Sequence, residues 1–132
     1  MISCQDSEIG FEDDEAYVAV GLRGNSCGSL PAIILQFPLE SDEQDIDLGM
    51  DSAHVDYSDE DTSQQGGYGL LRNVSARGEN MIRIVLSEGA IECGIPDCEF
   101  EFGFANALEP WKLDKLESLC GRLKVPFERQ RV

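Results

Sequence analysis

Short segments in which apolar and polar residues alternate run through the chain, and they predict a protein rich in β-strands. Residues 98–104 (CEFEFGF) are the clearest case, because their phenylalanines would share one face of a strand and their glutamates the other. Residues 52–57 and 81–86 alternate in a similar way. This pattern is typical of strands with one buried and one exposed face.

Three further segments are short, apolar and rich in β-branched residues, and they also predict strands. They are residues 16–22, 32–37 and 68–74. Residues 32–37 (AIILQF) are almost uniformly apolar, so we expect this strand to be central and covered on both faces. Turn-forming residues at 23–29 and 77–80 predict the connections that follow two of the strands.

Two segments have helical patterns. Residues 88–93 follow Ser87, which suits a helix N-cap, and precede Gly94, which suits a helix end, so they predict one or two turns. Pro110 can open a longer helix that continues to Pro126, because apolar residues recur there at three- and four-residue spacing. The predicted apolar stripe consists of Trp111, Leu113, Leu116, Leu119, Cys120 and Leu123.

These elements define a fold class. Strands dominate and do not alternate with helices, so we predict an α+β fold with a mostly antiparallel β-sheet, one short helix and one C-terminal amphipathic helix. A chain of 132 residues suits a single domain spanning residues 1–132. Residues 1–15 carry six carboxylates and no basic residue, and we expect them to begin loosely. Residues 127–132 are interpreted as a basic tail.

The charge balance changes the picture more than the composition does. The chain has 26 acidic and 10 basic residues, a net charge of −16. Residues 40–61 hold ten carboxylates and no lysine or arginine, and a packed core cannot accommodate so many charges. This acidic segment must lie on the surface. Its field disfavours binding to nucleic acid or to an anionic membrane, and it favours a basic protein partner or a cation.

We therefore predict that the acidic segment binds the partner. The predicted partner-binding residues are Asp42, Glu43, Asp45, Asp47, Asp51, Asp56, Tyr57, Asp59, Glu60 and Asp61. Residues 112–132 hold six of the ten basic residues and only three acidic ones, so the sequence has a negative middle and a mildly positive C-terminal end.

Candidate catalytic and metal-binding chemistry is sparse. His54 is the single histidine, and nothing in the sequence couples it to a nucleophile, so we predict no enzymatic activity. Cys93 and Cys98 lack the second ligand pair that a structural zinc site needs. Loops starting at Asp45 or Asp59 fail the EF-hand pattern. We predict no cofactor and no metal, although an irregular cation site remains an alternative.

The N-terminal residues show neither the basic nor the apolar region of a secretory signal, and the chain has five cysteines, an odd number. Reduced thiols and a cytoplasmic location are the simplest interpretation.

Four segments resemble the bacterial Imm10-type immunity proteins of polymorphic toxin systems. They are residues 34–37 (ILQF), 42–51 (DEQDIDLGMD), 66–69 (GGYG) and 86–95 (LSEGAIECGI), and the resemblance extends over roughly residues 30–104. The resemblance implies an intracellular protein that binds and silences a cognate toxin. It carries no active-site residue with it.

The function predicted from the sequence is therefore the neutralisation of a cognate bacterial toxin domain, through an acidic surface that complements a basic cleft. The alternatives are an acidic mimic of nucleic acid that regulates a DNA- or RNA-binding protein, and a cation-binding domain. The sequence leaves the oligomeric state undetermined.

Overall fold

The computed structural model describes residues 1–39, 52–60 and 64–130 of the chain. The strands are β1 (Ile2–Asp13), β2 (Tyr17–Asn25), β3 (Ala32–Pro38), β4 (His54–Ser58), β5 (Gln65–Tyr68), β6 (Leu71–Arg77), β7 (Met81–Leu86), β8 (Glu99–Gly103) and β9 (Phe127–Gln130). The helices in this part of the chain are α2 (Gly89–Glu92) and α3 (Pro110–Arg122).

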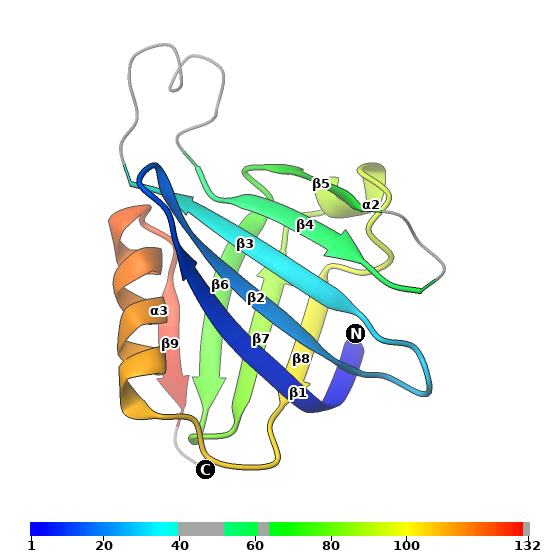
Figure 1. Cartoon of the computed structure of the whole chain (residues 1–132). Coiled ribbons are helices and arrows are strands. Elements are labelled where there is room, and N and C mark those ends of the chain that lie inside the picture. The colour runs from blue at the N-terminus through cyan, green and yellow to red at the C-terminus, as the bar shows by residue number, and fades with distance from the viewer. Residues whose placement is uncertain (40–51, 61–63, 131–132) are drawn as a thin grey trace.

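All nine strands belong to one hydrogen-bonded sheet, in the order β5-β4-β3-β2-β1-β8-β7-β6-β9. The sheet folds over at β1, so that strands β1–β5 form a first layer that crosses a second layer of strands β6–β9 (Figure 1). Each layer presents an inner face to the other and an outer face to the surroundings. This arrangement buries the apolar positions of the alternating strands between the layers.

The first strand belongs to both layers. Its residues Ile2–Cys4 run parallel to β8, whereas residues 8–13 pair antiparallel with β2. Between these parts lies a bulge in which Asp6 has a φ of 49°, and a bulge of this kind bends a strand. Gly24 of β2 passes close to the bend, because a Cβ there would collide with the side chain of Ser7.

Apolar side chains from both layers form one core. The ring of Tyr57 in β4 packs against Phe100 in β8, with the ring centroids 5.5 Å apart. The largest fully buried side chains are Tyr57, Phe37, Phe100, Phe102, Leu22, Ile33, Leu35, Ile82, Ile84, Ile95, Leu116 and Val20. Among the residues that the structure describes, no polar or charged residue is buried. The carboxylates of this part of the chain therefore lie at the surface.

Helix α3 covers one side of the two layers (Figure 1). Its buried residues are Leu113, Leu116, Leu119 and Cys120. Basic side chains of the helix contact the ends of the first layer: Lys115 Nζ lies 2.9 Å from Asp13 Oδ1, and Arg122 donates a 2.6 Å hydrogen bond to the carbonyl oxygen of Leu39. The helix therefore joins the layers through both apolar packing and charge.

Much of the predicted fold is confirmed. The protein is mostly β-sheet, strands lie at or beside each predicted position, and both predicted helices are present. Helix α2 is a single turn followed by Gly94 with a φ of 92°. The predicted strand at 68–74 is in fact divided into β5 and β6 by Gly69, which also has a positive φ.

The sheet is mostly antiparallel, as predicted, but it also contains two parallel pairs, β1–β8 and β6–β9. Two other predictions are wrong. Residues 1–15 do not begin loosely, since twelve of them form β1, whose inward side chains pack on the core. Residues 127–130 are not a tail, since they form β9 beside β6. In each case a distant strand supplies hydrogen bonds that the local sequence cannot reveal.

Smaller differences concern single side chains. Strand β3 is covered on one face only, and Ile34 on its outer face is 38% exposed. Trp111 is half exposed and packs on Phe11 at a centroid distance of 5.6 Å, so it lies at the margin of the predicted stripe. The N-cap of α2 is Glu88 rather than Ser87, and it makes no side-chain capping bond.

Candidate functional site

The negative charge of the protein is concentrated in the first 71 residues of the sequence. Residues 1–71, which contain β1–β5, carry sixteen carboxylates against the single arginine Arg23, a net charge of −15. Residues 72–132 carry ten carboxylates and nine lysines or arginines, a net charge of −1. Strands β1–β5 come from the first group of residues and strands β6–β9 from the second, so the charges of the described strands differ between the two layers.

The outer face of the first layer is the surface that this charge surrounds. We define this outer acidic face by the outward-facing residues of strands β1–β5, which alternate with buried neighbours. They are Glu8, Gly10, Glu12, Ala19, Gly21, Arg23, Ala32, Ile34, Gln36, His54, Asp56, Ser58, Gly66 and Tyr68. Apart from Arg23 and the ionisable His54, its charged residues are all acidic.

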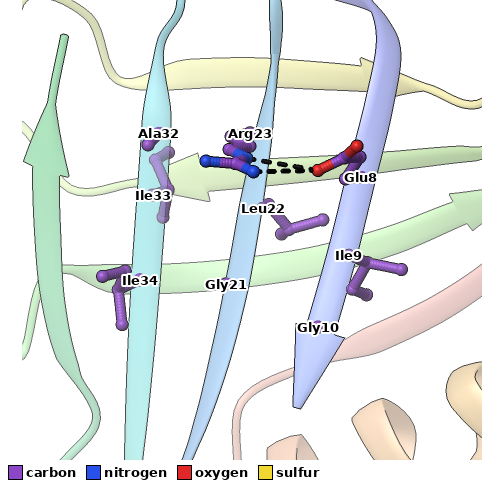
Figure 2. Close-up of a pocket in the computed structure, with 9 residues that line it drawn as sticks. All are labelled: Glu8, Ile9, Gly10, Gly21, Leu22, Arg23, Ala32, Ile33 and Ile34. Carbon is purple, nitrogen blue, oxygen red and sulfur yellow. Dashed lines mark hydrogen bonds and ion pairs between the residues drawn. The ribbon is translucent and has the colours of Figure 1, made fainter. Parts of the chain in front are cut away.

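A shallow depression lies at the centre of the β1–β3 part of this face, with a volume of about 370 Å³. Figure 2 shows Gly10 of β1, Gly21 of β2 and Ile34 of β3 along it, and the ion pair between Glu8 and Arg23 at one end. Both Nε and an Nη atom of Arg23 donate to the same carboxylate oxygen of Glu8, at 3.2 and 3.1 Å. This contact occupies the one arginine of the layer.

The β4–β5 part of the face carries the only histidine. His54 Nδ1 lies 3.3 Å from Asp56 Oδ2, an ion pair when the imidazole is protonated, but the geometry is not that of a hydrogen bond. The His54 ring meets Tyr68 edge to face, with the centroids 4.6 Å apart, and Tyr68 is 42% exposed. An aromatic ring and two polar side chains thus lie beside one another on an open sheet face.

Two of the predicted partner-binding residues interact with each other. The hydroxyl group of Tyr57 donates a 2.6 Å hydrogen bond to Asp59 Oδ2, just beyond the end of β4. Burial, reinforced by this bond, raises the pKa of Tyr57 above its ordinary value, so the phenol stays protonated. The ring is 1% exposed, so Tyr57 belongs to the core and holds Asp59 in position rather than contacting a partner through its ring.

The structure describes four of the ten predicted partner-binding residues. Of these, Asp56 lies on the outer acidic face, Asp59 follows β4, and Glu60 is exposed. The other six lie outside the described residues: Asp42, Glu43, Asp45, Asp47, Asp51 and Asp61. Five of them belong to the segment that joins β3 to β4, and Asp61 belongs to the segment that joins β4 to β5. Both segments therefore connect strands of the first layer.

The contribution of β1 and β2 to this face was missed at the sequence level. Glu8, Gly10 and Glu12 alternate with Ile9 and Phe11, which is the same pattern that predicted other strands. The density of carboxylates led to the interpretation of a loose terminus instead. The alternation was therefore the signal that could have identified this part of the face.

Two of the five cysteines are buried in the core. Burial raises the pKa of Cys4 to about 11 and that of Cys120 to about 12, so both thiols are protonated at neutral pH. Cys27 is exposed, and Cys93 and Cys98 are partly buried. Within residues 1–39, 52–60 and 64–130, no group of three or more histidine, cysteine or carboxylate side chains is placed to hold a metal ion.

The fold and this face define a class of protein: a small acidic β-sandwich with an open, negatively charged sheet surface. A family model described as Immunity protein 10 matches residues 5–106, which is more than half of the chain. The chain belongs to the immunity protein 10 family. Membership of this family indicates a toxin-neutralising role, and it confirms the resemblance found in the sequence.

Other comparisons add no relatives. No curated protein and no solved structure matches the chain significantly. In the part of the chain that the structure describes, neither helix has the length and apolarity needed to cross a membrane.

Proposed function

We propose that this protein neutralises a cognate bacterial toxin domain by binding a basic surface of the toxin with its acidic layer. The match to the immunity protein 10 family carries the proposal, since it indicates a toxin as the partner. The net charge of −15 in residues 1–71 supports the finer statement that the toxin surface is basic. Charge complementarity of this kind speeds the encounter of two proteins, by up to about a thousandfold at low salt.

The proposed contact surface includes the acidic segment predicted from the sequence. Its proposed members are Asp42, Glu43, Asp45, Asp47, Asp51, Asp56, Asp59, Glu60 and Asp61, with Tyr57 supporting Asp59. We also propose that the protein acts in the cytoplasm without catalysis of its own, and that it binds neither nucleic acid nor membranes. The dense negative charge supports the last point, because phosphate groups would be repelled.

An experiment on association rates tests the proposal. The partner would be the toxin domain encoded beside the gene for this chain, and the variant would replace Asp42 and its neighbours Glu43, Asp45 and Asp47 with Asn or Gln. A charge about 10 Å from a partner charge contributes roughly 0.2 kcal/mol at about 50 mM salt. We therefore expect association about fourfold slower at that salt concentration and less than about twofold slower at about 300 mM.

A matched control removes four charges from the other part of the chain. Glu79, Glu88, Glu92 and Glu101 lie in the nearly neutral half of the sequence and are replaced by glutamine. We expect this control to change the rates less than the variant of the acidic segment does. Equal effects would mean that net charge alone matters, and failure of the wild-type protein to bind the toxin domain would refute the proposed function.

A nucleic-acid mimic would share the acidic layer, so charge alone does not separate the two functions. The family match favours the toxin. Binding to the toxin domain that resists competition by DNA and by other DNA-binding proteins would support this choice.

A further inference from the structure

Two glycines face outward side by side on the first layer, and at neither position does packing against neighbouring atoms require a residue without a side chain. Gly10 of β1 pairs directly with Gly21 of β2, and Gly21 pairs with Ile34 of β3. A Cβ built at either glycine would have no atom within 4 Å, and neither residue has the positive φ that favours glycine. Glycine weakens the interior of a strand, and where it persists it often marks the close approach of another molecule.

The missing side chains create the depression of about 370 Å³ described above, as Figure 2 shows. Its floor is the backbone of β1 and β2, and one wall is the exposed side chain of Ile34. One end of the depression is charged, because Glu8 and Arg23 form their ion pair there. A depression without side chains on its floor, with an apolar wall and a charged border, has room for one anchoring apolar side chain of a protein partner.

The charge of the surroundings indicates what this partner is. The depression is formed by strands from residues 1–71, a part of the sequence with a net charge of −15, and Glu12 and Asp56 occupy the same outer face. A second copy of this chain would bring the same negative layer and be repelled. A basic protein surface is complementary to the face.

We propose that the depression at Gly10 and Gly21 receives an apolar side chain of the toxin domain that is flanked by lysine or arginine. This inference rests on the proposed function, and it adds a specific contact to the general attraction between charges. The attraction brings the two proteins together, whereas the anchoring side chain slows their separation. Filling the depression should consequently raise the dissociation rate and leave the association rate almost unchanged.

The substitution Gly21→Tyr tests this inference, because tyrosine favours strands and its ring would cover the depression. Affinity and rates for the toxin domain would be measured together with the melting temperature. We expect affinity at least about tenfold weaker, through faster dissociation, with a melting temperature that does not fall. Gly10→Thr fills the same space with a smaller side chain and should weaken binding to a lesser degree.

The matched control is Ser75→Tyr, which adds a ring to the outer face of β6, where another shallow depression lies. We expect this variant to bind as the wild type does. The inference is overturned if Gly21→Tyr and Gly10→Thr bind as tightly as the wild type, or if Ser75→Tyr weakens binding equally. If Gly21→Tyr proves unstable, Gly10→Thr decides. Wild-type protein that fails to bind the toxin domain refutes the proposed function, a different outcome from binding that tolerates a filled depression.

Discussion

The substitution Leu116→Ala tests whether α3 is an integral part of the fold. The side chain of Leu116 is fully buried, between Leu113 and Leu119 on the inner face of the helix. Loss of a leucine side chain from such a site costs about 2–5 kcal/mol in the free energy of unfolding. A two-state chain of this length loses roughly 3–4 °C of melting temperature per kcal/mol. We expect the melting temperature to fall by about 7–18 °C.

The matched control is Lys115→Ala, one position earlier on the same helix. Lys115 Nζ lies 2.9 Å from Asp13 Oδ1, but the aspartate side chain is 68% exposed, and such surface pairs contribute at most about 1 kcal/mol. Thermal unfolding followed by circular dichroism compares the two variants with the wild type. Small and equal shifts for both would refute the reasoning, since they would mean that α3 is not packed on the two layers.

The remaining predictions concern thiols and a phenol. In the native protein, iodoacetamide should modify Cys27 first, while Cys4 and Cys120 should react only after unfolding. Mass spectrometry measures the modification, and equal modification of the three cysteines in the native protein would contradict the burial of Cys4 and Cys120. The pKa values of the two buried thiols are raised from 9.0 to about 11 and about 12, so their contribution to stability should be complete below pH 9 and should be lost as pH rises toward these values. Urea unfolding at several pH values above 8, compared between the wild type and a Cys120→Ala variant, would detect this loss. Tyr57→Phe removes the donor to Asp59 and should lower the free energy of unfolding by about 0.5–1.5 kcal/mol, and an unchanged urea midpoint would show that the bond contributes nothing.

The sequence was sufficient to predict the strands and helices in which apolar residues recur at a regular spacing. Alternation predicted β4, β7 and β8, and the three- and four-residue spacing predicted α3, because burial of one face leaves a periodic trace. The parallel pairing of β1 with β8 and of β9 with β6 could not be predicted in this way. Those pairs join residues far apart in the chain, and nothing in either strand records which partner it meets.

The candidate site was predictable in its charge but not in its shape. The excess of carboxylates before residue 72 is a property of the sequence, and the structure adds that the strands of this part, β1–β5, lie side by side in one layer. The depression at Gly10 and Gly21 depends on the register of β1 against β2 and of β2 against β3. Isolated glycines gave no sign that they would be neighbours on an open face.

The path of β1 through both layers also determines when a newly made chain can complete its fold. The turn between β2 and β3 spans six residues, whereas pairing Ile2 with Phe100 closes a segment of 98 residues, at an additional entropic cost of about 2.5 kcal/mol. The hairpins of the acidic layer are thus the first contacts available to a growing chain, but their apolar side stays unsupported until β6–β8 have been synthesised. A chain that ends before Phe100 therefore lacks the strand that pairs with Ile2 and part of the layer that covers this apolar side.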